Sequence, residues 1–171
     1  SLGLAKIATL IKRERAINPN VLYVDSGDLL QGSPLLDWFR RYGGPDDIDP
    51  MIASLGLMGC VAFGVGNHDY NYGLDVLYKA RKDAGFPFLS ANVFDAESGE
   101  RVFDPYVLIV IQGVKVGLIG TTPPGVAIWD KAHVQGKLRF ADIVETFKEF
   151  VPELKAKGAD VVIGVPHTGL G

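Results

Sequence analysis

Two hydrophobic patterns alternate along the chain. Apolar residues that recur three and four positions apart indicate amphipathic helices, and short unbroken apolar runs indicate buried strands. Helices are predicted over residues 4–17, 34–42, 50–57, 74–84 and from Asp142 to near Gly158. Strands are predicted over residues 21–24, 61–65, 88–92, 106–111, 115–120 and 160–165, with 106–111 and 115–120 forming an antiparallel pair.

The alternation of helices and strands indicates an α/β fold. The predicted strands are continuous apolar runs, so we expect them to form a sheet that is covered on both faces. A chain of 171 residues is long enough for one domain. It begins with a helix that would ordinarily follow a strand, and it ends one loop after a strand. We therefore expect residues 1–171 to be part of a larger domain.

Composition excludes several classes of protein. The chain has 47% hydrophobic and 22% charged residues, which is close to the globular average and excludes global disorder. A net charge of −3 gives no overall basic surface for a nucleic acid polymer. The single cysteine, Cys60, cannot build a disulfide framework or a cysteine-based zinc site, and we expect it to be buried and inert. No apolar stretch reaches the roughly 18 residues that a membrane helix needs.

Three of the predicted strands end in residues that can bind a metal ion. Asp28 follows the first of these strands, Asn67 and His68 follow the second, and His167 follows the third. In open α/β sheets, ligands bind at the carboxyl ends of the strands. If the three strands are parallel neighbours, their side chains meet at one edge, where their oxygen and nitrogen donors suit one divalent cation.

Each of these residues also has an ordinary structural explanation. Asp28 could cap the helix that follows it. Asn67 could mark a simple turn, and a lone histidine such as His167 is often only hydrogen-bonded. His133 lies in a polar stretch far from any strand end, and we interpret it as structural. The coincidence of donors at three separate strand ends favours the functional interpretation.

Residues 27–34 (GDLLQGSP) followed by residues 66–69 (GNHD) resemble the calcineurin-like metallophosphoesterases, and within them the nucleotidase branch. Further segments are similar to the catalytic domain of the 2′,3′-cyclic-nucleotide 2′-phosphodiesterase/3′-nucleotidase group, and the similarity covers nearly the whole chain. These segments are Asn71-Tyr72-Gly73-Leu74, Asn92-Val93, Trp129-Asp130-Lys131 and residues 158–162 (GADVV). The resemblance implies a layered α-β-β-α fold with mixed sheets covered by helices.

The resemblance also implies roles for individual residues. Asp28 would bridge two divalent metal ions, and Asn67 and His167 would bind the second of them. His68 would not be a ligand; it would lie near the scissile phosphate, where it stabilises charge or protonates the leaving oxygen. Related nucleotidases often have an aspartate where this chain has Asn71. Asn71 would orient the His68 ring without supplying charge, and Asp69 could compensate.

Metal chemistry explains this donor set. Two divalent cations about 3.5–4 Å apart neutralise phosphate oxygens and acidify a bridging water for in-line attack on phosphorus. Carboxylate oxygen and imidazole suit Mn, Zn, Fe, Co or Mg, so the metal is left open. The expected substrate is a nucleotide, and neither a nucleic acid polymer nor a membrane is expected as a partner.

The family pattern includes a D-x-H block and a GHxH block that these residues lack. We therefore expect residues 1–171 to be a partial N-terminal catalytic domain, without the C-terminal domain that holds the nucleotide base. We expect the chain alone to bind at most one divalent ion, weakly, and to hydrolyse phosphodiesters poorly or not at all. The resemblance further implies a periplasmic or secreted protein.

Three alternatives compete with this assignment. A 5′-nucleotidase or UDP-sugar hydrolase belongs to the same superfamily, and Asn71 with the Tyr-Gly-Leu that follows weighs against it. A non-catalytic nucleotide-binding or interaction module on a degenerate phosphoesterase scaffold would not need the intact metal-binding residues. A dinucleotide-binding site has no support, because no G-x-G-x-x-G motif opens a helix after a strand.

Overall fold

The computed structural model describes residues 3–168. The helices are α1 (Leu4–Ile17), α2 (Pro34–Tyr42), α3 (Pro50–Leu57), the single 3-10 turn η1 (His68–Tyr70), α4 (Leu74–Asp83), α5 (Val126–Trp129), α6 (Lys131–Val134) and α7 (Ile143–Ala156). The strands are β1 (Tyr23–Asp25), β2 (Cys60–Gly64), β3 (Phe88–Leu89), β4 (Val93–Asp95), β5 (Tyr106–Ile111), β6 (Val114–Thr121), β7 (Leu138–Phe140) and β8 (Val161–Pro166).

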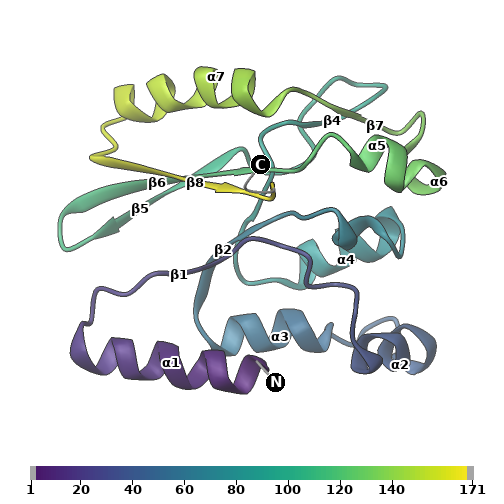
Figure 1. Cartoon of the computed structure of the whole chain (residues 1–171), viewed down its shortest axis with the longest axis horizontal. Coiled ribbons are helices and arrows are strands. Elements are labelled where there is room, and N and C mark those ends of the chain that lie inside the picture. Colours follow the sequence, from purple (N-terminus) through teal and green to yellow (C-terminus); the bar gives the residue numbers. More distant parts are fainter. Residues whose placement is uncertain (1–2, 169–171) are drawn as a thin grey trace.

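Two three-stranded sheets are stacked between layers of helices (Figure 1). In the first sheet, β1, β2 and β3 run parallel in that order. In the second sheet, β6 pairs antiparallel with β5 and parallel with β8. Helices α1 and α3 lie below the first sheet and α7 lies above the second (Figure 1). This arrangement confirms the layered α-β-β-α fold, and β4 and β7 add a small antiparallel pair at one end.

The hydrophobic core follows these layers. One cluster joins α3 and α4 to the first sheet, through residues such as Leu55, Leu77 and Phe63. A second cluster lies between the two sheets, and its fully buried members are Ala62, Leu89 and Leu118. A third cluster packs α7 on the second sheet, through residues such as Phe150, Leu154 and Ile119. Each sheet is therefore covered by helices on one face and by the other sheet on its second face.

The strands that end in candidate ligands are not all neighbours in one sheet. β1 and β2 are adjacent and parallel, as expected, whereas β8 belongs to the second sheet. The sheets approach closely where these strands end, because a Cβ added to Gly64 at the end of β2 would lie 3.0 Å from the Val165 carbonyl oxygen in β8. The three loops therefore meet through the stacking of two sheets and not along the edge of one.

Two segments differ from the sequence prediction. The strand predicted at 88–92 stops at Leu89, since the buried Asn92 turns its side chain toward other segments. Its amide nitrogen donates to the carbonyl oxygens of Thr122 and Ala141, at 2.8 and 3.0 Å, and its amide oxygen accepts from the Thr122 N–H at 2.9 Å. No helix is predicted between Pro124 and Asp142, whereas the structure has the short helices α5 and α6 there.

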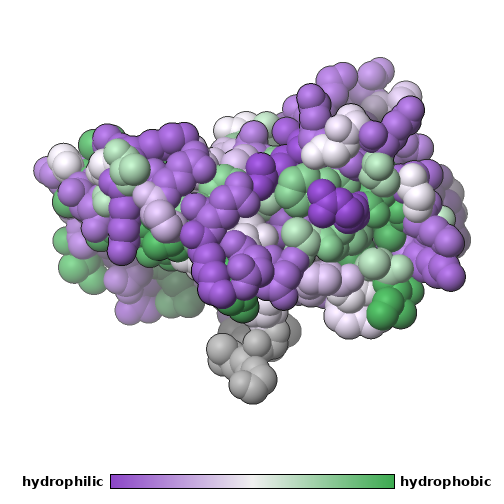
Figure 2. All heavy atoms as spheres, turned by 90° about the horizontal axis from the view of Figure 1, so that it is seen from above, coloured by the Kyte–Doolittle hydropathy of each residue, from purple (hydrophilic) through white to green (hydrophobic). Residues whose placement is uncertain are grey.

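The surface above α7 is mixed in character. Seen from that side, hydrophilic side chains predominate and hydrophobic ones gather in smaller areas (Figure 2). Within residues 3–168, no helix combines the length and the apolar character that crossing a bilayer requires.

Candidate metal centre

The loops after β1 and β2 are joined by the buried carboxylate of Asp69. This side chain is 0% exposed. It accepts hydrogen bonds from the backbone N–H groups of Gly66, Asp28, Leu29 and Leu30, at 2.8–3.0 Å. Burial raises the pKa of Asp69, and the N–H donors act in the opposite direction. Asp69 thus fixes the position of two chain segments about 40 residues apart in the sequence.

Asp28 lies in a left-handed backbone conformation, with φ of +64°. Aspartate tolerates this region better than most residues do, although the conformation is uncommon. Gly27 before it has φ of +99°, and a Cβ on Gly27 would lie only 2.5 Å from the Gly64 carbonyl oxygen. The close approach brings the Asp28 carboxylate to the second loop, where its Oδ1 accepts the His68 backbone N–H at 2.8 Å.

His167 reaches the same place from the second sheet. Its backbone N–H donates to the Thr121 carbonyl oxygen at 3.0 Å, which continues the pairing of β8 with β6. Its Nδ1 lies 2.7 Å from the Ser26 carbonyl oxygen, and its Nε2 lies 3.0 Å from Asp28 Oδ2. The two side chains are partly accessible, at 21% for His167 and 28% for Asp28.

The protonation pattern of His167 favours a cation at this position. A carbonyl oxygen can only accept, so Nδ1 must carry the proton in the bond to Ser26. In the neutral ring, Nε2 then directs its lone pair at a carboxylate oxygen, which is unfavourable without a positive charge between them. Histidines that bind metals commonly donate their other ring N–H to a backbone carbonyl in this way.

The spacing of the two donors also fits a metal ion. In an octahedral site, two neighbouring ligand atoms about 2.1 Å from the ion lie about 3.0 Å apart, which is the distance between His167 Nε2 and Asp28 Oδ2. Asn67 lies between two residues that contact Asp28. Its neighbour His68 binds Asp28 Oδ1 through the backbone, and a Cβ on Gly66 would lie 2.6 Å from the Asp28 nitrogen and 2.9 Å from His167 Cε1.

Residues 3–168 contain no group of three or more His, Cys, Asp or Glu residues that could hold a metal ion. The donors that the structure brings together are therefore one carboxylate and one imidazole, and the backbone on either side of Asn67 lies next to them. The residues present fit part of a divalent metal site.

The exposed side chain of His68 is oriented by Asn71. His68 Nδ1 lies 2.7 Å from Asn71 Oδ1, and Asn71 Nδ2 donates to Asp130 Oδ1, also at 2.7 Å. The idea that Asp69 compensates at His68 is not supported by its contacts, since both Asp69 oxygens accept from backbone N–H groups. The residue behind Asn71 is Asp130, which is 59 positions away in the sequence.

Sequence reasoning did not identify Asp130 as part of the site. The Trp129-Asp130-Lys131 segment contributes to the family resemblance, but no local pattern connects Asp130 with position 71. His133, on the helix α6 that follows Asp130, lies near Gly73, where an added Cβ would be 3.4 Å from the His133 Nδ1. It is close to the loop that carries Asn71, and no hydrogen bond to His68 is described for it.

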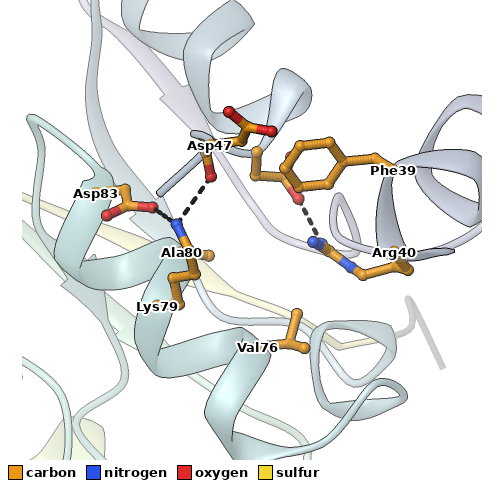
Figure 3. A pocket seen from close by; sticks show the side chains of 8 residues that line it. Phe39, Arg40, Asp47, Val76, Lys79, Ala80 and Asp83 are labelled. Atoms are coloured by element: carbon orange, nitrogen blue, oxygen red, sulfur yellow. Dashed lines mark hydrogen bonds and ion pairs between the residues drawn. The ribbon is translucent and has the colours of Figure 1, made fainter. Parts of the chain in front are cut away.

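A small cavity away from the candidate metal centre, between α2 and α4, has no room for a nucleotide. It has a volume of about 40 Å³, which is room for about one water molecule. Its charged side chains already pair with one another (Figure 3): Arg40 with Asp49, and Lys79 with Asp83 and the Asp47 carbonyl oxygen. These pairs hold α2, α4 and the loop before α3 together.

Comparison with known proteins agrees with this geometry. No family model matches the chain. A 2′,3′-cyclic-nucleotide 2′-phosphodiesterase/3′-nucleotidase of Yersinia enterocolitica is 39% identical over 178 residues, which cover 98% of this chain and 27% of that protein. A 5′-nucleotidase of Vibrio cholerae is 34% identical, over 98% of this chain and 30% of that protein. The chain thus spans less than a third of the length of these two relatives.

A solved structure shows the same fold. The crystal structure of the calcineurin-like phosphoesterase YfkN from Bacillus subtilis superposes with a TM-score of 0.93 and 42% sequence identity. The match covers 99% of this chain and 55% of that one. The likeness therefore includes every element of the described structure that contributes to the candidate centre.

Proposed function

From the premise that the chain belongs to the calcineurin-like phosphoesterases, we propose that it is the metal-binding part of a phosphoester hydrolase that acts on nucleotides. A 2′,3′-cyclic nucleotide is the substrate that the proposal favours, with 3′-nucleotidase activity beside it. The observation that carries the proposal is the meeting of Asp28 and His167 at 3.0 Å, with the His167 proton held on the far side of the ring.

In this proposal Asp28, Asn67 and His167 hold a divalent ion. When bound, such an ion neutralises phosphate oxygens and lowers the pKa of a water molecule. Asp28 keeps Oδ2 directed at the site, because Oδ1 is held by the His68 N–H. His167 is aligned by its bond to the Ser26 carbonyl, so its Nε2 needs no reorientation to bind the ion.

His68 handles a proton in the same proposal. Its Nδ1 hydrogen is held by Asn71, which leaves Nε2 as the ring nitrogen that can face the departing ribose oxygen. A protonated Nε2 would give its hydrogen to that oxygen as the phosphorus–oxygen bond breaks. The exposure of the His68 side chain is compatible with contact to a substrate.

Further parts of the active protein are included in the proposal. The described donors form part of the site for one metal ion, and the Asp28 carboxylate could bridge to a second ion. We propose that the remaining ligands and a nucleotide-binding domain come from segments beyond residues 1–171, since the relatives are more than three times as long as the matched region. Export to the periplasm or beyond is also proposed, and fractionation of the producing cells tests it.

The test uses the complete reading frame that encodes this chain. With Mn²⁺ present, we expect turnover of 2′,3′-cyclic AMP that exceeds turnover of 5′-AMP. Asp28→Ala should abolish turnover and weaken metal binding, and His68→Ala should lower kcat about 100-fold or more while the metal stays bound. Asp142→Asn, which keeps the cap of α7, is the control. Loss of metal from His68→Ala would refute the assigned role, and a metal-free, inactive wild type would refute the function.

A 5′-nucleotidase is the second candidate, because the Vibrio cholerae relative carries that name at 34% identity. The higher identity to the cyclic phosphodiesterase, 39%, favours the first candidate. The ratio of the two AMP activities decides between them. A non-catalytic binding module would hold nucleotide without turning over either substrate.

A further inference from the structure

The junction of α5 and α6 contains a buried carboxylate with an unusual set of contacts. Asp130 is 6% exposed. Its Oδ1 accepts from Asn71, and its Oδ2 is buried without a hydrogen-bond partner among residues 3–168. Asp130 is the N-cap residue of α6, a position where aspartate commonly caps the helix, yet its side chain makes no capping bond. Burying a carboxylate with one direct partner is costly, so local structure does not explain it.

Asp69 gives the contrast within the same molecule. Asp69 is fully buried, and four backbone N–H groups satisfy its two oxygens. The contacts of Asp69 therefore account for its burial by joining two loops. Asp130 instead directs its one bond at the residue that contacts His68.

The direction of each hydrogen bond in this chain of residues follows from chemistry. An ionised carboxylate can only accept, so the Asn71 atom that faces Asp130 must be the amide nitrogen. The amide oxygen of Asn71 then faces His68 and also can only accept. His68 Nδ1 must therefore carry a hydrogen. Without Asp130, nothing in this chain of contacts would prevent the Asn71 amide from turning over and offering its NH₂ group to His68.

We propose that Asp130 is a positioning residue for His68: it locks the Asn71 amide in one orientation, which keeps the hydrogen on His68 Nδ1 and leaves Nε2 free to face the leaving group. The catalytic part of this statement rests on the proposed function. The packing supports a fixed Asp130, because Val126 and Val134 on either side of it are 0% and 1% exposed and belong to the main core cluster.

The first test needs neither metal nor substrate. The chain contains three histidines, so long-range ¹H–¹⁵N spectra of the imidazole rings can be assigned with His133→Gln and His68→Gln variants. Spectra are recorded about two pH units above the ordinary histidine pKa of about 6.5, in the presence of a chelator. We expect His68 to carry its hydrogen on Nδ1 in the wild-type chain.

Asp130→Asn is the decisive variant, because it keeps the shape of the side chain and replaces an obligate acceptor by a group that can donate or accept. We expect the His68 signals to move toward the Nε2–H form, and Asp130→Ala to move them at least as far. Asp142→Ala, which removes an unrelated helix cap, should leave them unchanged. Unchanged His68 signals in a folded Asp130→Asn or Asp130→Ala variant would overturn the proposal, and so would an Nε2–H ring in the wild type.

The second test uses the complete protein and two leaving groups. For 2′,3′-cyclic AMP, which expels a ribose oxygen, Asp130→Asn should lower kcat about tenfold or more with little change in KM. For bis-p-nitrophenyl phosphate, whose acidic phenol leaves without a proton donor, kcat should change less than about threefold. Equal losses on both substrates would indicate a merely structural role. If the wild type hydrolyses neither substrate, the proposed function fails, and the imidazole spectra still decide the role of Asp130.

Discussion

Gly27 and Gly32 offer a direct test of how closely the loop after β1 must approach β2. Both have a left-handed backbone, with φ of +99° and +105°. A Cβ on Gly32 would meet nothing within 4 Å, whereas a Cβ on Gly27 would lie 2.5 Å from the Gly64 carbonyl oxygen and 2.8 Å from Gly66 Cα. Substituting alanine at each position therefore imposes the same backbone strain, and only Gly27→Ala adds a clash.

The expected magnitudes follow from this difference. Left-handed backbone costs alanine about 1–2 kcal/mol, so Gly32→Ala should destabilise the chain by about that amount. Ordinary contact distances are about 3.5–4.0 Å, so Gly27→Ala must move the loops apart by about 1 Å. Such overpacking costs about 1–3 kcal/mol more, which gives about 2–5 kcal/mol in total.

Metal binding separates the two variants further. A shift of about 1 Å would lengthen the bond from the His68 N–H to Asp28 Oδ1, now 2.8 Å, beyond hydrogen-bonding range. We expect Gly27→Ala to weaken Mn²⁺ binding about 10- to 100-fold and Gly32→Ala to leave it unchanged. Urea unfolding and calorimetric titration measure both quantities. Equal destabilisation and equal affinity in the two variants would refute the idea that close loop approach builds the site.

Further predictions concern two buried acidic groups, Cys60 and Asp69. Burial raises the pKa of the Cys60 thiol to about 11, so at pH 9 iodoacetamide should react about 100-fold more slowly with the folded chain than with the urea-unfolded chain; similar rates would contradict it. Because the folded thiol keeps its proton where the unfolded one releases it, stability should also fall as pH rises from about 9 to 11. Asp69→Asn should lower the free energy of unfolding by about 2–4 kcal/mol, since one amide oxygen cannot accept four buried N–H groups; Asp142→Asn is the control, and a loss no larger than the control's would contradict the role of Asp69.

The first three helices could be predicted closely from the sequence because the spacing of their apolar residues and the residues that cap them are visible locally. The predicted helices at 4–17, 34–42 and 50–57 match α1, α2 and α3. Ser33 and Asp49 cap α2 and α3 through bonds to the backbone N–H groups of Leu36 and Met51. Periodicity and capping are local properties, so a local pattern is sufficient to find them.

The local sequence does not show which of the two sheets a strand belongs to. A buried strand shows a continuous apolar run whether its faces are covered by two helical layers or by one helical layer and another sheet. The apolar run at 160–165 therefore allows a place beside the first two strands, whereas β8 lies in the second sheet. The loop that carries His167 still reaches Asp28, because stacking brings the ends of β2 and β8 together.

In the candidate site, too, the residues with a local sequence signal could be predicted, and the one that depends on the packing of distant segments could not. Asp28, Asn67, His68 and His167 follow strand ends and could be proposed from the sequence, and the structure brings Asp28 and His167 into contact. Asn71 could also be predicted as the partner of the His68 ring, because the two residues are three positions apart and one turn of the chain brings their side chains together. Asp130 could not be found, because its relation to position 71 depends on how two short helices pack on the core 59 residues later.

The contacts that hold the candidate centre are separate from the two atoms that would bind an ion. Asp69 holds both ligand loops through backbone donors, and the Ser26 carbonyl holds the His167 ring. None of these bonds uses Asp28 Oδ2 or His167 Nε2, the two atoms that face each other at the candidate site. An ion would therefore replace one contact, between two groups that repel unless a proton lies between them. Because the bonds that hold the loops do not involve these two atoms, little backbone movement should accompany metal binding.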